Sequence, residues 1–200
     1  MFLDDCAPSS AATPLSTLDT GRADREPSLD DLLPVYEVRM RQSITVRRPP
    51  EAALAAAQML AGEHTPFGWL SRMPRPLGSA PRSKRGANGG VPALYRSEQR
   101  VLVGLVGRLG DVDATLRPAC SLDELRRFAE DGGCRIAFDV RARPGLGKST
   151  RLTAELRISA VDEAAEQVLR ARWRVIGLAA HVAVRSFLGA VRQHLEAAIH

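Results

Sequence analysis

Apolar and polar positions alternate with a period of two in several stretches of the chain. From Tyr36 to Val46 the even positions are apolar except Gln42, and the odd positions are polar. This alternation predicts a long, half-buried strand. The same alternation over 134–142 and 152–160, joined by the turn PGLGKST, predicts an antiparallel hairpin whose outer-face charges pair across the strands. Two further strands are expected over 93–98 and 100–108.

Other segments carry helical signals. Pro50 precedes the apolar run EAALAAAQML, which predicts a helix that ends at Gly62. Ser121 and Glu124 form a capping box, so a short helix is expected from about Leu122 to Glu130. From residue 162 onward the apolar spacing is three or four, which predicts a long terminal helix with a kink at Gly177.

This order of elements predicts an α+β fold in which a curved antiparallel β-sheet grips a long C-terminal α-helix. Such a pairing often leaves an apolar space that holds a small molecule, and the alternative is that side chains fill the space completely. We expect the segment around Phe67 and Trp69 to dock on the body as a gate. The candidate cavity residues are Tyr36, Val38, Met40, Gln42, Phe67, Trp69, Tyr95, Ile136, Phe138, Leu156, Val184 and Leu188.

The charge divides the chain into two parts. Residues 1–33 hold seven acids and two arginines, a net −5, so the total of +5 leaves +10 on residues 34–200. The first part lacks periodicity and is predicted to be a disordered acidic tail that lies transiently on the basic body. Residues 34–200 are expected to form one domain, with a mobile basic loop at about 74–92.

The basic body does not by itself predict a nucleic-acid partner. Its basic residues alternate with acids, and no helix-turn-helix, zinc-finger or RNA-binding aromatic motif accompanies them. The segment from Gly145 to Thr150 ends like a phosphate-binding P-loop, but the pattern after it is that of a strand, whereas a P-loop opens a helix. We therefore expect neither nucleic acid nor nucleotide to bind.

Catalytic and metal signals are weak. The four histidines have no metal-like spacing, and no nucleophile motif is present, so we expect no metal, no cofactor and no assigned catalytic residue. Two aspartates follow the start where a secretory signal needs basic charge, and no apolar run has the length of a membrane span. A cytoplasmic location with three reduced cysteines and no stable membrane insertion is predicted, and the oligomeric state stays open.

Several stretches resemble a known superfamily: LVGLVGR at 102–108, TRLTAELRI at 150–158, Val161-Asp162, and WRVI at 173–176 before the terminal helix. The chain is similar to an uncharacterised bacterial branch of the START-like, helix-grip (SRPBCC) proteins, which include polyketide cyclases and lipid-transfer domains. The resemblance implies the helix-grip fold and an apolar ligand such as a lipid, a polyketide or an aromatic compound. It does not imply a particular reaction.

Three functions are consistent with these observations. The first is a non-catalytic binding protein for an apolar or amphipathic small molecule. The second is a cyclase or dehydratase that uses Tyr36, Gln42, Tyr95 or His64 around its substrate. The third is a protein-interaction module in which the acidic tail or the basic 72–100 region docks a partner.

Overall fold

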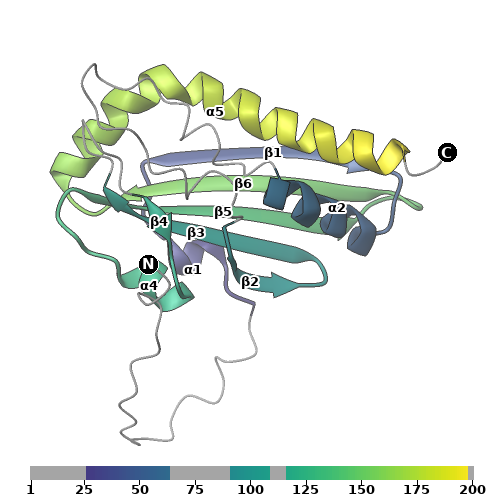
Figure 1. Cartoon of the computed structure of the whole chain (residues 1–200), viewed down its shortest axis with the longest axis horizontal. Helices are drawn as coiled ribbons and strands as arrows, with labels where there is room; N and C mark the ends of the chain where they lie inside the picture. Colours follow the sequence, from purple (N-terminus) through teal and green to yellow (C-terminus); the bar gives the residue numbers. More distant parts are fainter. Residues whose placement is uncertain (1–25, 64–90, 109–115, 198–200) are drawn as a thin grey trace, which may run out of the picture.

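The core of the protein is one six-stranded sheet in which every paired strand is antiparallel. A computed structural model of the chain describes residues 26–63, 91–108 and 116–197. The strands are β1 (Val38–Val46), β2 (Ala93–Ser97), β3 (Arg100–Arg108), β4 (Arg117–Pro118), β5 (Gly133–Pro144) and β6 (Thr150–Ala160). Their order is β1-β6-β5-β3-β2, and β4 pairs with β3 (Figure 1).

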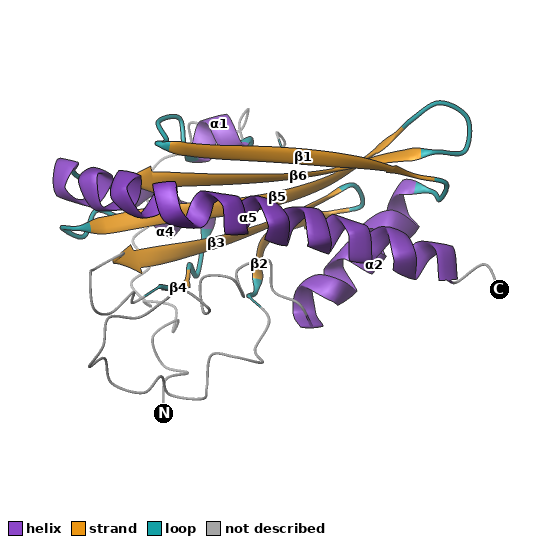
Figure 2. Cartoon of the chain, turned by 90° about the horizontal axis from the view of Figure 1, so that it is seen from above, coloured by secondary structure: helices purple, strands orange, loops and turns teal. Residues whose placement is uncertain are grey.

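Helices lie on both faces of this sheet. The long helix α5 (Glu163–Ala197) and α2 (Pro50–Glu63) cover one face, which we call the inner face. The short helices α1 (Leu29–Leu32) and α4 (Leu122–Arg127) lie on the opposite, outer face (Figures 1 and 2). The predicted helix-grip arrangement of an antiparallel sheet and a long C-terminal helix is therefore present.

The long helix is bent, as the glycine in its middle predicts. Its arms, Glu163–Arg174 and Gly177–Ala197, meet at 70°. Within the described residues no single helix is long and apolar enough to cross a membrane, although the two arms of α5 together pass a test of length and composition. The side chains of Leu169, Val184 and Leu188 are buried against the sheet, which is the behaviour of a core helix.

The inner face carries the main hydrophobic core. Alternate residues of β1, β5 and β6 point toward α2 and α5, as the period-two pattern predicts. The strand pairing in the hairpin runs from Cys134 opposite Ala160 to Pro144 opposite Thr150. The five residues between these strands form a turn in which Gly147 has a φ of +65°, a conformation that favours glycine. The turn leads into a strand, so it does not have the geometry of a P-loop.

The outer face is only partly exposed to solvent, and this corrects the predicted boundary of the domain. Leu29, Leu32 and Leu33 are at most 2% exposed, although they fall within the 1–33 segment expected to be disordered. Ser28 and Asp31 form a capping box that begins α1, and the leucines pack with Leu102 and Leu125 in a second apolar cluster. The domain therefore includes residues 26–33, while residues 1–25 lie outside the described part.

This second layer is closely packed. A side chain at Gly104 of β3 would lie 2.6 Å from Leu94 and 3.0 Å from Leu125, so glycine lets the outer layer approach the sheet. Four polar residues on this face, Arg100, Asp139, Arg157 and Ser159, are at most 3% exposed for the same reason.

The charge pairing across the hairpin is not as expected. The register places Asp139 opposite Glu155 and Arg143 opposite Arg151, which are pairs of like charge. The acids instead bond to arginines two residues along their own strand, Arg141 to Asp139 at 2.6 Å and Arg157 to Glu155 at 2.9 Å. The five-residue turn sets this register, and its conformation was not evident from residue types.

The cysteines also differ from expectation. Cys134 is a free thiol in the inner core, and burial raises its pKa to about 12, so it is protonated and unreactive at neutral pH. Cys120 is disulfide-bonded, so the prediction of three reduced thiols is wrong at this position.

Candidate functional site

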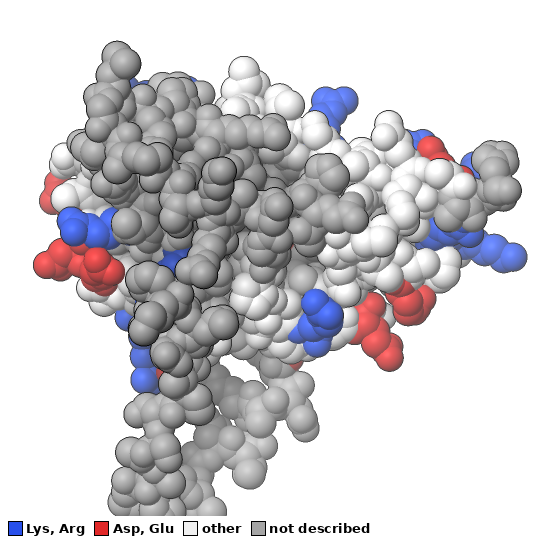
Figure 3. Space-filling view, in the orientation of Figure 1, with Lys and Arg blue, Asp and Glu red and all other residues white. Residues whose placement is uncertain are grey.

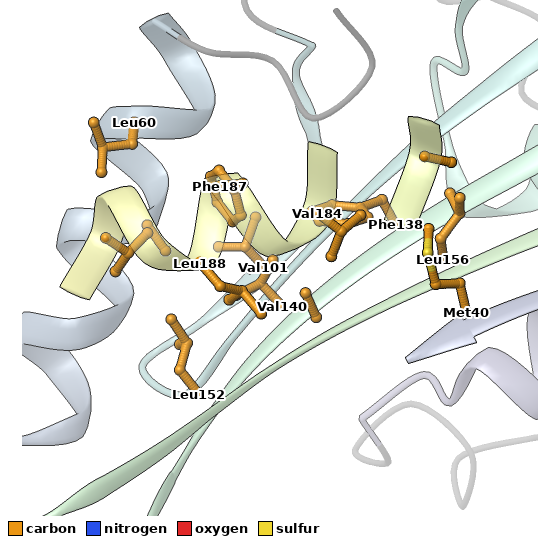
Figure 4. Close-up of a cluster of buried hydrophobic side chains, with 14 of the residues drawn as sticks. Met40, Leu60, Val101, Phe138, Val140, Leu152, Leu156, Val184, Phe187 and Leu188 are labelled. Atoms are coloured by element: carbon orange, nitrogen blue, oxygen red, sulfur yellow. The ribbon is translucent and has the colours of Figure 1, made fainter. Parts of the chain in front are cut away.

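The sheet-to-helix layer brings together seven of the predicted cavity residues. They come from β1, β5, β6 and α5, they all belong to the inner core, and none is more than 5% exposed. Figure 4 shows several of them pointing toward one another between the sheet and α5, where Phe138 packs edge-on against Phe187 with ring centroids 6.1 Å apart. The seven are Val38, Met40, Ile136, Phe138, Leu156, Val184 and Leu188.

A polar pair lies at the β1 edge of this layer. The amide nitrogen of Gln42 donates to the backbone oxygen of His181 at 3.1 Å, and it lies 3.3 Å from Nδ1 of the same residue. Gln42 is half-buried and His181 is exposed, so the pair stands where the inner layer meets the surface. Sequence reasoning identified Gln42 as the one polar residue on the apolar face but did not single out His181.

Tyr36 and Tyr95 are not in this layer, which corrects the prediction for both. Tyr36 lies before β1 begins. The guanidinium carbon of Arg157 lies over the Tyr36 ring on the outer face, 4.6 Å from the centre of that ring. Tyr95 follows a bulge in the pairing of β2 with β3, and the extra residue turns it to the outer side, opposite Leu102. The catalytic hypothesis therefore loses two of its four residues.

Three further residues cannot be placed. Phe67 and Trp69, the expected gate, and His64 lie in the segment 64–90, outside the described residues. The predicted basic loop at 74–92 lies there as well, apart from Val91 and Pro92.

Comparison with known proteins finds solved structures of low similarity to this chain. No family model matches the chain, and no curated protein matches it. The crystal structure of TTHA0849 from Thermus thermophilus is 16% identical, with a TM-score of 0.37, over 80% of this chain and 99% of that one. The Zhui aromatase/cyclase from Streptomyces sp. R1128 is 13% identical, with a TM-score of 0.39, over 82% and 96%. The helix-grip assignment rests on the strand order and on α5.

The outer face holds a pocket of about 540 Å³. Its floor is formed by the outward residues of β1, β6 and β5, and residues 28–30 at the start of α1 form one wall. Six arginines and three carboxylates line it, a net charge of +3. They are Arg39, Arg41, Arg141, Arg143, Arg151 and Arg157, with Asp30, Asp139 and Glu155.

Two buried arginines attach the segment 26–33 to this face. Arg157, 3% exposed, contacts Asp30 at 2.7 Å and donates to the backbone oxygen of Leu33 at 3.3 Å. Arg100, 2% exposed, contacts Asp139 at 2.7 Å and donates to the backbone oxygen of Pro27. The end of the acidic segment is thus held on its own basic body.

The two faces differ in what they can bind. The inner layer is a buried apolar core with one polar pair at its edge. The outer pocket offers guanidinium groups, which suit oxyanions. The described residues contain no group of three or more side chains positioned to hold a metal ion.

The sequence did contain a signal for the outer layer. Ser28 and Asp31 have the spacing of a capping box, and the leucines at 29, 32 and 33 have helical spacing. No comparable signal marked Arg100, Asp139 or Arg157, because strand alternation alone does not show which outward residues a second layer covers.

Proposed function

We propose that this protein binds an apolar or amphipathic small molecule, such as a lipid, a polyketide or an aromatic compound, between the sheet and α5. The observation that carries the proposal is the convergence of inner-face residues from β1, β5, β6 and α5 on one apolar layer. The Gln42–His181 pair at the edge supports an amphipathic ligand, because its polar groups can orient a polar end while the apolar part is buried.

The alternatives have less support. A cyclase or dehydratase needs acid–base groups within hydrogen-bond reach of the reacting atom, and Tyr36 and Tyr95 lie on the other face of the sheet. An interaction module that presents the acidic segment needs that segment to be free, and Glu26 and Asp30 contact Arg100 and Arg157 of the same chain. Binding without an assigned reaction is the function that the geometry favours.

The test uses the neutral, environment-sensitive dye Nile red with the full chain. Val184→Phe adds volume to the inner layer, where Val184 is 2% exposed, and Leu102→Phe adds volume to the outer cluster, where Leu102 is fully buried. Overpacking costs each variant about 1–3 kcal/mol of stability. We expect wild type and L102F to bind the dye and V184F to bind it much more weakly.

Native mass spectrometry of the purified wild type, followed by solvent extraction, gives a second readout that does not depend on the variants. A co-purifying organic compound of low polarity supports the proposal. Failure of the wild type to bind Nile red together with an empty extract contradicts it, and so does equal loss of dye binding in V184F and L102F.

A further inference from the structure

We propose that the outer pocket is a second binding site, for a small molecule that carries two or more oxyanion groups of the phosphate type. Its centre is the pair Arg143 and Arg151, at the hairpin end of the sheet. This proposal goes beyond the inner-face function and does not depend on it, because the two sites lie on opposite faces of the sheet.

The strand register places the polar residues of this face in rows across the sheet. Arg143 lies opposite Arg151, which lies opposite Thr45. In the next row Thr153 lies between Arg141 and Ser43, and its hydroxyl is 3.0 Å from that of Ser43. These two rows contain arginines and hydroxyl groups but no carboxylate.

The carboxylates of the pocket lie nearer to α1, and each is already engaged. Glu155 contacts Arg39 at 3.1 Å and Arg157 at 2.9 Å. Asp139 contacts Arg100 and Arg141, and Asp30 contacts Arg157. The positive charge of the pocket is therefore unbalanced mainly at the hairpin end.

Arg143 and Arg151 are the unbalanced charges. Both are exposed, and neither has an ion pair or a side-chain hydrogen bond among the described residues. Directly opposite residues of an antiparallel pair have Cβ atoms about 4.5–5.5 Å apart, and like charges in such a pair destabilise the sheet. A bound oxyanion between the guanidinium groups would convert this repulsion into two attractions.

The chemistry of the lining indicates the class of ligand. A guanidinium group binds phosphate or carboxylate with two parallel hydrogen bonds, and the neighbouring hydroxyls can donate further ones. The volume of about 540 Å³ suits a small molecule rather than a single ion. The wall formed by Ser28 and Leu29 closes one side, which favours a compact ligand over a long polymer. On the visible face of Figure 3, which is drawn from another side, basic and acidic groups are interspersed.

The experiment measures binding of inorganic pyrophosphate by isothermal titration calorimetry at low salt. The test variant is R143Q/R151Q, and the matched control is R127Q/R192Q, which removes two exposed arginines from α4 and α5. We expect the test variant to bind pyrophosphate at least about tenfold more weakly than wild type. We expect the control to stay within about twofold, because distant surface charges contribute little.

Thermal unfolding shows whether the test variant is folded and whether it senses the anion. Without pyrophosphate, R143Q/R151Q should unfold at or above the wild-type midpoint, since a like-charge pair has been removed. Pyrophosphate should raise the midpoint of wild type and of R127Q/R192Q, because a ligand of the native state stabilises it. It should leave the midpoint of R143Q/R151Q unchanged.

Two further probes distinguish the source of the phosphate group. Sedimentation with vesicles of phosphatidylinositol 4,5-bisphosphate in phosphatidylcholine, lost in R143Q/R151Q, identifies a lipid headgroup, and pyrophosphate binding without vesicle binding identifies a soluble ligand. The proposal is overturned if wild type does not bind pyrophosphate at millimolar concentrations, or if both double variants lose affinity equally. It is also overturned if single-stranded RNA binds more tightly than pyrophosphate through the same two arginines.

Discussion

The two faces of the sheet are both covered, but by different means. The inner face is buried under α2 and the long helix α5 mainly by apolar side chains, with one polar pair at its edge. The outer face is covered only in part, by the short helices α1 and α4. Their leucines pack in a second apolar cluster, and two buried arginines pair with carboxylates beside it. The inner layer depends on burial of apolar area, and the outer layer depends as well on charges that must stay paired.

This difference has a consequence for function. We propose the mainly apolar inner layer as the site of an apolar or amphipathic ligand. On the outer face, the charges near α1 are paired. At the hairpin end, Arg143 and Arg151 face each other without a carboxylate, and we propose that an anion binds there. The same strands, β5 and β6, contribute to both faces, because successive residues along a strand point to opposite sides of the sheet.

The largest expected effect comes from breaking the buried charge pair of the outer face. Asp139→Asn removes the buried counter-charge of Arg100 and leaves only the exposed Glu26, 3.7 Å away, so we expect a loss of about 3–5 kcal/mol in the free energy of unfolding. Urea denaturation measures it. The matched Asp123→Asn, in an exposed pair with Arg127, should cost less than about 1 kcal/mol. Equal losses would show that the outer layer does not depend on its ion pair.

The next effect tests whether α1 is part of the domain. Leu32 is fully buried, so Leu32→Ala should cost about 2–5 kcal/mol in urea denaturation. Leu146 is 96% exposed, and Leu146→Ala should change stability by less than about 0.5 kcal/mol. If the two leucines behave alike, residues 26–33 do not contribute to folding.

A smaller effect tests the like-charge pair. Arg143→Glu places opposite charges across the hairpin and should raise the free energy of unfolding by about 0.2–1 kcal/mol. Arg96→Glu, on β2 opposite Val101, makes the same change in net charge without a charged partner across the strand. A gain that is equal in both variants would indicate a general effect of net charge.

The smallest effect concerns Asp162, which lies between the end of β6 and the start of α5. Its carboxylate accepts backbone hydrogen bonds from Ala165 and Gly132, at 2.7 and 2.6 Å, and these bonds lower its pKa. Its contribution to stability is therefore complete above the unfolded pKa of about 4 and is lost as the pH falls through the lower folded pKa. Unfolding measured from neutral to acid pH should show this loss in wild type but not in Asp162→Ser, which keeps a helix cap without the charge.

The inner face could be predicted from sequence because one rule governs it. Alternation with a period of two assigned Val38, Ile136 and Leu156 to the face that α5 covers, and helical spacing assigned Val184 and Leu188 to the helix. The rule failed where the backbone is irregular. Tyr36 precedes β1, and a bulge lies between Ala93 and Tyr95. Both tyrosines therefore face the outer side of the sheet and not the inner side that alternation predicts.

The outer face could be predicted only in part. Its capping box at Ser28 was visible in the sequence, but the pairing of Arg143 with Arg151 depends on the conformation of a five-residue turn. The position of the second layer decides which arginines are buried. That position follows from contacts between residues about 70 to 125 positions apart, such as Arg157 and Leu33. The composition shows the excess of arginine, but it does not show that Arg143 and Arg151 are the arginines that face each other.

The most direct test of two separate sites is the affinity of R143Q/R151Q for both probes in one preparation. We expect this variant to bind pyrophosphate at least about tenfold more weakly than wild type and to bind Nile red as wild type does. A variant that loses both probes together, or that keeps both, would contradict the assignment of the two faces to two different ligands.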